Sequence, residues 1–176
     1  VIELISEISG LSYEGNENSM RIIADHIRTS VMLIGDINGI VPSNVGAGYI
    51  LRRLIRRAIR HSRKIGMDTN ELASLAKIYI EQIYDEAYPL LKEKEEYIVS
   101  ELNKEIDKFN KTIETGIKEF DKLVSGLARK VEFMKKSNPD YVETDADKII
   151  SGKSSFRLYD TFGFPLELTE ELASEQ

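Results

Sequence analysis

Cysteine is absent from this 176-residue chain, and only two histidines are present, His26 and His61. Without cysteine there is no disulfide and no thiolate metal site, and two separated histidines form no ligand cluster. Long apolar runs are missing too, since the longest, near residues 31–34, is far too short to span a bilayer. The first residues also lack the features of a secretory signal, and the chain has no initiating Met. We therefore expect a segment of a cytoplasmic protein with no membrane partner.

Glycine and proline are scarce, with 11 and 4 residues respectively, and hydrophobic residues make up 41% of the chain. This composition is typical of a folded globular domain, and the length allows one sizeable core. Apolar residues recur at steps of three and four almost throughout, which is the period of an amphipathic helix. The sequence therefore predicts an all-α domain.

The predicted helices are separated by short connections. A first helix is expected from Asn18 or Ser19 to Gly35, and a second from about Tyr49 to Ile65. A third follows Asn70, and a long amphipathic helix begins near Pro89 and continues to about residue 130. Residues 135–155 are expected to form a loop or excursion. A short extended run (156–159), a turn (160–163) and a terminal helix opening at residue 169 complete the prediction.

Acidic residues are missing from residues 37–67, although the chain has 30 of them and a net charge of −6. The basic residues in this window are Arg52, Arg53, Arg56, Arg57, Arg60, Arg63 and Lys64. On a helical wheel they fall within an arc of roughly 140°, and apolar residues such as Leu51, Ile55 and Ile59 fill the other side. We expect this helix to pack by its apolar face and to expose a basic ridge.

A basic ridge predicts contact with a polyanion, because a local patch sets the field that a ligand meets even when the whole chain is acidic. Most of these residues are Arg, whose planar guanidinium can bind a phosphate by two hydrogen bonds. The ridge alone would bind RNA or DNA without reading a sequence. The alternative is a solvated face neutralised by the acidic long helix, although no acid stands at i+4 within the window.

Three stretches resemble the signature segments of alanyl-tRNA synthetases and occur in the order of that family. They are ADHIRTSVMLIGDINGIVPSN with VGAGYILRRLIRRAIRH (residues 24–61), FNKTIETG (109–116) and LYDTFGFPLELT (158–169). The likeness covers essentially the whole chain. It implies that residues 1–176 form the helical domain that follows the class II catalytic domain and recognises the acceptor stem of tRNA(Ala), including its G·U wobble pair.

In the family, an Asn and an Asp approach this wobble pair from opposite grooves, and the matching residues are Asn44 and Asp160. The chemistry agrees, because a carboxylate can accept from the guanine N2 amino group in the wide, shallow minor groove of A-form RNA. An amide carries both a donor and an acceptor, which suits a base-pair edge that presents both kinds of group. Taken without the family, Asn44 could cap the basic helix or stabilise its turn, and Asp160 could bond its own backbone in an Asx-turn.

The resemblance also implies a parent enzyme that joins alanine to tRNA with ATP. No motif that binds ATP or alanine is found in this sequence, so we expect no catalytic residue, metal or cofactor within it. ATP with Mg and zinc are expected only in other domains of the parent chain. The catalytic and editing domains of that chain would then be partners of this segment, together with the tRNA.

Two other functions remain open from the residues alone. The first is a helical module that binds nucleic acid without specificity, for which the ridge would suffice. The second is a helical scaffold for protein interaction, with the long helix (residues 90–130) as its partner surface. The apolar spacing of that helix is longer than the 3.5 residues of a left-handed coiled coil, which makes the scaffold a poor fit.

Overall fold

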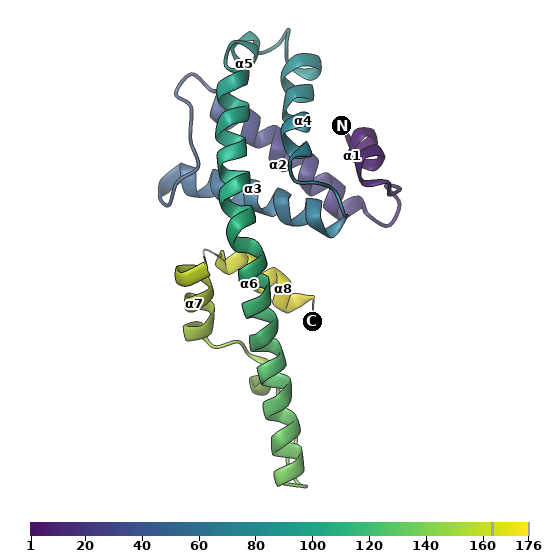
Figure 1. The fold of residues 1–176 in the computed structure, drawn as a ribbon, viewed down its shortest axis with the longest axis vertical. Coiled ribbons are helices and arrows are strands. Elements are labelled where there is room, and N and C mark those ends of the chain that lie inside the picture. The colour runs from purple at the N-terminus through teal and green to yellow at the C-terminus, as the bar shows by residue number, and fades with distance from the viewer. Residues whose placement is uncertain (163, 176) are drawn as a thin grey trace. The chain divides into compact units, whose positions relative to one another are not determined.

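The computed structural model describes residues 1–162 and 164–175, and the chain divides into two compact units, residues 1–108 and 109–176. In Figure 1 the first unit runs from purple to teal and the second from green to yellow. Every regular element among the described residues is a helix. The all-α prediction is therefore confirmed.

The first unit is built from short and medium helices and the beginning of one long helix. In chain order its elements are α1 (Ile2–Ser9), α2 (Glu17–Gly35), α3 (Gly46–Lys64), α4 (Glu71–Ile78), the π-helix η1 (Tyr79–Ile83), α5 (Pro89–Glu93) and the first turns of α6 (Glu95–Ser137). The predicted boundaries of α2 and α3 differ from these by only a few residues. Pro89 stands at the first turn of α5, where its missing N–H leaves no helical hydrogen bond unmade.

Packing in the first unit centres on α2 and α3. The predicted apolar positions of α2 are each at most 1% exposed, namely Met20, Ile23, Ile27, Val31 and Ile34. Leu51, Ile55 and Ile59 of α3 are fully buried, and so are Ile98 and Leu102 of α6. Each such side chain stabilises the fold by about 1.5–3 kcal/mol through removal of apolar surface from water. The apolar face of α3 thus packs into the core as predicted.

The loop before α3 folds back tightly over the first turn of that helix. A Cβ on Gly48 would collide with the carbonyl oxygen of Val41 and with Ser43 Oγ. The backbone N–H of Ser43 donates to the Gly48 carbonyl at 3.0 Å, and Ser43 Oγ donates to the Val45 carbonyl at 2.9 Å. Only glycine at position 48 allows this approach. The consequence is that Asn44, between Ser43 and Val45, is held beside the start of α3.

The second unit contains the rest of α6 together with η2 (Asp145–Lys148), α7 (Gly152–Phe162) and α8 (Leu166–Ser174). The connection from α6 to α7 is shorter than the predicted excursion over residues 135–155, because α6 continues to Ser137 and α7 begins at Gly152. Two ion pairs tie the connection to α6, Lys135 with Glu143 at 2.7 Å and Lys130 with Asp147 at 3.5 Å.

The extended run predicted at residues 156–159 is wrong, since these residues lie inside α7. Of the predicted turn at 160–163, residues 160–162 also belong to α7, and residue 163 lies outside the described residues. The helix forms because Ser151 caps it: Ser151 Oγ accepts from the Ser154 N–H at 3.2 Å, three residues on. The last helix begins at Leu166, before the Thr169 start that the sequence suggested.

Two of the signature stretches meet inside the second unit. A Cβ on Gly116 of α6 would collide with the ring of Phe164, which is fully buried. The Phe164 N–H donates to the Leu158 carbonyl of α7 at 3.1 Å, so the chain turns back over the end of that helix. The glycine of FNKTIETG therefore makes room for the second phenylalanine of LYDTFGFP, and this contact fixes the corner that follows α7.

Candidate nucleic-acid interface

The basic residues of α3 differ in exposure along the helix. The exposed ones, called the basic stripe from here on, are Arg53, Arg57, Arg63 and Lys64. On a wheel of 100° per residue, Arg53, Arg57 and Lys64 fall within about 40° of one another. The guanidinium of Arg53 also lies over the ring of Tyr49, 5.9 Å from its centroid. The basic stripe is a cationic surface on one side of α3.

The prediction that all seven basic side chains are exposed is wrong for Arg56 and Arg60, which are only 5% and 7% exposed. Arg52 is half-buried. A helical wheel contains one helix only, so it shows neither α6 nor the chain that follows α3. In the structure α3 has packed neighbours on more than its apolar side. The predicted ridge is therefore reduced to the basic stripe.

One carboxylate from α6 binds two of the arginines of α3, the half-buried Arg52 and the buried Arg56. Oε1 of Glu105 accepts from Nε of Arg56 at 2.6 Å and from Nε of Arg52 at 3.2 Å. Glu105 itself is 5% exposed. Burial lowers the pKa of the Arg56 guanidinium from its ordinary value, and the charge of Glu105 opposes this shift. The two arginines and the glutamate form a largely buried charged cluster.

Glu105 was not among the residues that the sequence singled out. A local signal was present, since Glu105 lies between Leu102, Ile106 and Phe109, which are all buried on α6. An acid within an apolar stripe indicates a buried partner of opposite charge, because a carboxylate is rarely buried without one. The sequence alone could not identify that partner, which stands about 50 residues earlier in the chain.

Asn44 is exposed and lies directly before α3. It does not cap the helix, because the N-cap residue is Val45 and no side chain bonds the first turn. Instead Oδ1 of Asn44 accepts a hydrogen bond from Nη1 of Arg52. Asn44, Arg52 and Glu105 thus form a chain of contacts that runs from the surface to the interior of the first unit.

Asp160 lies in the last turn of α7, in the second unit, and its side chain is exposed. The Asx-turn alternative does not apply, since Asp160 has a helical backbone. Two exposed aromatic residues of the same helix, Phe156 and Tyr159, have ring centroids 6.5 Å apart. On the α7 wheel these three residues fall within about 100°. One face of α7 therefore combines a hydrogen-bond acceptor with aromatic surface.

His26 is a core residue. It is 9% exposed on α2, and its Nδ1 lies 3.4 Å from a carboxylate oxygen of Asp25. Asp25 is also bound by Arg28 at 2.6 Å. Burial and these neighbours are typical of a structural histidine.

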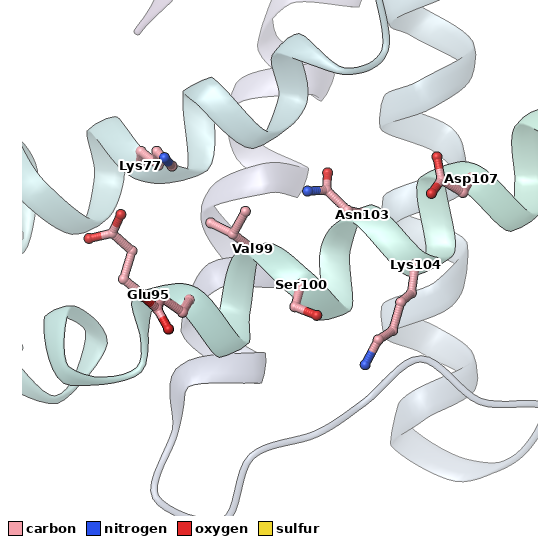
Figure 2. A pocket seen from close by; sticks show the side chains of 8 residues that line it. Lys77, Glu95, Val99, Ser100, Asn103, Lys104 and Asp107 are labelled. Atoms are coloured by element: carbon pink, nitrogen blue, oxygen red, sulfur yellow. The ribbon is translucent and has the colours of Figure 1, made fainter.

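A shallow groove of about 480 Å³ lies between α4 and α6 in the first unit (Figure 2). Its lining residues are Lys77, Glu95, Glu96, Val99, Ser100, Asn103, Lys104 and Asp107. Figure 2 shows Lys77 on one helix, with Glu95, Val99 and Asn103 pointing toward that helix from the other. Acidic residues outnumber basic ones here, which makes the groove a poorer site for a phosphate than the basic stripe.

Among the described residues, no group of three or more His, Asp or Glu side chains is placed to hold a metal ion. Across residues 1–162 and 164–175, no helix is both long enough and apolar enough to cross a membrane.

Comparison with known proteins gives one consistent family. The model for tRNA synthetases class II (A) matches residues 1–176. Alanine–tRNA ligase of Treponema denticola is 48% identical over 178 residues, and that of Borrelia hermsii is 44% identical; each match covers 99% of this chain and 27% of the relative. Alanine–tRNA ligase of Prochlorococcus marinus is 42% identical over 99% of this chain and 18% of its own length. The chain thus spans about a fifth to a quarter of these relatives, and it belongs to the class II (A) family of tRNA synthetases, as a region of the alanyl-tRNA synthetases.

Proposed function

We propose that this chain binds the acceptor stem of tRNA(Ala), with the basic stripe on phosphates and with Asn44 and Asp160 on the G·U wobble pair. The observation that carries the proposal is the exposure of the basic stripe on α3, in a window without acids, beside an exposed amide held to the same helix. Phosphate contacts would position the stem, and the two polar side chains would supply specificity.

Asp160 and Asn44 would contact the wobble pair through different chemical groups. The carboxylate of Asp160 is an acceptor and suits the guanine N2 amino group in the minor groove. Phe156 and Tyr159 offer aromatic surface beside it, to which ribose or an unpaired base can pack. Asn44 would meet the pair from the other groove. If the duplex were bound only through its phosphates, neither Asp160 nor Asn44 would contribute to base recognition.

The relatives are named as ligases of alanine and tRNA. We propose that this chain serves the same reaction as part of a cytoplasmic parent enzyme that joins alanine to tRNA with ATP. Binding of ATP with Mg, and of zinc, is assigned to other domains of that enzyme. Within it, the role of this region is to select the tRNA.

Titration of the chain with two acceptor-stem duplexes, identical except for a G·U or a G·C pair, tests the proposal. Tighter binding of the G·U duplex supports it. Equal binding of both duplexes would favour a non-specific nucleic-acid module. Absence of binding at low salt would favour a helical scaffold for protein contacts, because the basic stripe should attract any duplex under those conditions.

Asp160→Ala is expected to reduce the preference for G·U over G·C by about 1–3 kcal/mol, the usual range for one specific base contact. The reason is that alanine removes the acceptor for the guanine amino group. The measurement is the ratio of the two dissociation constants. Glu170→Ala, an exposed acid of α8 in the same unit, is the matched control and should leave the ratio unchanged. An equal loss of affinity on both duplexes would count against base reading by Asp160.

Arg57→Ala is expected to weaken both duplexes alike and to lower the slope of log K against log salt by about 0.9, as the loss of one phosphate contact does. Arg28→Ala provides a control, since this partly exposed arginine lies on α2 and pairs with Asp25. The control should keep the slope of the unmodified chain. If the Arg57 variant had the same salt dependence as the unmodified chain, the basic stripe would not be part of the interface.

A further inference from the structure

A chain of contacts through Arg52 connects the buried carboxylate of Glu105 to the exposed side chain of Asn44. Glu105 is 5% exposed, and the side chain of Arg52 is 15% exposed. Nε of Arg52 is bound to Glu105 at 3.2 Å, while Nη1 of the same guanidinium is bound to Asn44. A planar guanidinium held at one edge has its other donors fixed in direction. Arg52 therefore acts as a rigid link between the interior and the loop.

The link determines which end of the Asn44 amide faces outward. Arginine carries donors only, so the atom of Asn44 that faces Arg52 has to be the carbonyl oxygen. The amino group, Nδ2, is then the end left for a ligand, and the described residues supply no acceptor for it. An amide that could otherwise offer either edge is thereby restricted to donation. This differs from the mixed edge expected from the sequence.

Restriction to a donor matters for the choice between G·U and G·C. In the major groove uracil, like thymine, presents the O4 acceptor, whereas cytosine presents the N4 amino donor. The guanine partner presents acceptors in both pairs. Side chains cannot read that deep, narrow groove inside a continuous A-form helix, so the contact requires a base pair near the end of the stem. A fixed donor would bind the uracil edge and meet a second donor on cytosine, whereas a freely rotating amide could turn its oxygen to cytosine.

We propose that Glu105 is a positioning residue for base recognition: through Arg52 it holds Asn44 with its amino group outward, and so makes the loop selective for a pyrimidine with an acceptor at position 4. This inference rests on the proposed function, since it needs Asn44 to read the pair. Arg52 then serves as the link and is not a phosphate ligand. Arg56, on the same carboxylate oxygen, keeps Glu105 in place from the other side.

A double-mutant cycle on the full chain tests the proposal. The variants are Glu105→Gln, Asn44→Ala and the pair together, each titrated with the G·U and G·C duplexes. Glu105→Gln is expected to lower the G·U preference by about 5-fold or more, the lower end of what one base contact provides. In the Asn44→Ala background the same change should have no further effect on the preference, because the residue that it positions is gone.

If Glu105 had only a structural role, Glu105→Gln would weaken the binding of both duplexes equally, whether or not Asn44 is present. That result overturns the proposal. It is also overturned if Asn44→Ala lowers the preference but Glu105→Gln does not. If Asn44→Ala itself leaves the preference intact, the proposed function of Asn44 fails first, and the positioning role fails with it. Arg52→Lys supplies the same test should Glu105→Gln not fold, since lysine cannot bind both partners with one planar group. Glu101→Gln, one turn earlier on α6, is the control.

Discussion

Replacing Glu105 with alanine is expected to lower the free energy of unfolding of the first unit by about 3–5 kcal/mol, the usual cost of removing one partner of a buried ion pair. The large effect follows because Arg56, which is 5% exposed, would keep its charge in the interior after losing the carboxylate that accepts from its Nε at 2.6 Å. Arg52 would lose its anchor as well. Urea denaturation followed by circular dichroism measures the change.

Glu101→Ala is the comparison that isolates burial. Glu101 lies one turn before Glu105 on α6 and pairs with Lys104 at 2.6 Å; the Glu101 side chain is 17% exposed, but the Lys104 side chain is 66% exposed, so the pair borders solvent. An exposed pair of this kind contributes about 0–1 kcal/mol. Similar losses in the two variants would mean that Glu105 stabilises the unit by helix propensity or surface charge, and that the buried cluster has little net effect.

Phe164→Ala is expected to cost about 3–5 kcal/mol in the stability of the second unit, the range for removing a fully buried phenylalanine. The ring packs against Gly116, so its loss leaves a cavity that no side chain at position 116 can fill. Hydrogen exchange in α7 and α8 should accelerate, because the corner between these helices depends on this contact. The preference for G·U should fall with it, since Asp160 lies in the last turn of α7.

The matched control is Phe156→Ala, which removes the same side chain from an exposed position of α7, where it is 63% exposed. Stability should change by less than about 0.5 kcal/mol, as for most surface substitutions. If both phenylalanine variants were equally stable, the packing of Phe164 on Gly116 would not be what holds the corner after α7.

Periodicity predicted the packed faces of this protein well, because burial of an amphipathic helix depends on residues three and four apart within that helix. The α2 positions from Met20 to Ile34 illustrate this, and so does the apolar face of α3. The outline of the candidate interface came from the same source, together with the absence of acids from residues 37–67.

The errors have two sources, contacts with a distant segment and a local helix cap that was overlooked. Arg56 was placed on an exposed face because a single-helix wheel contains no Glu105, and this acid stands 49 residues later. The helix at residues 156–159 was missed because its capping serine, Ser151, lies in a polar stretch that reads as loop. The restriction of Asn44 to donation was equally hidden, since it depends on which atom of Arg52 remains after Glu105 is bound.

Because Glu105 follows α3 in the chain, the ribosome synthesises it later than the arginines that it binds. Within α3, Arg52 and Arg56, and Arg56 and Arg60, are one turn apart, and like charges at this spacing destabilise a helix by about 0.2–0.5 kcal/mol per pair. The carboxylate that binds Arg52 and Arg56 is synthesised 49 residues after Arg56, several seconds later at ordinary elongation rates. Until α6 is made, the nascent α3 therefore lacks the partner of Arg52 and Arg56, and the loop that carries Asn44 completes its chain of contacts only when that helix emerges.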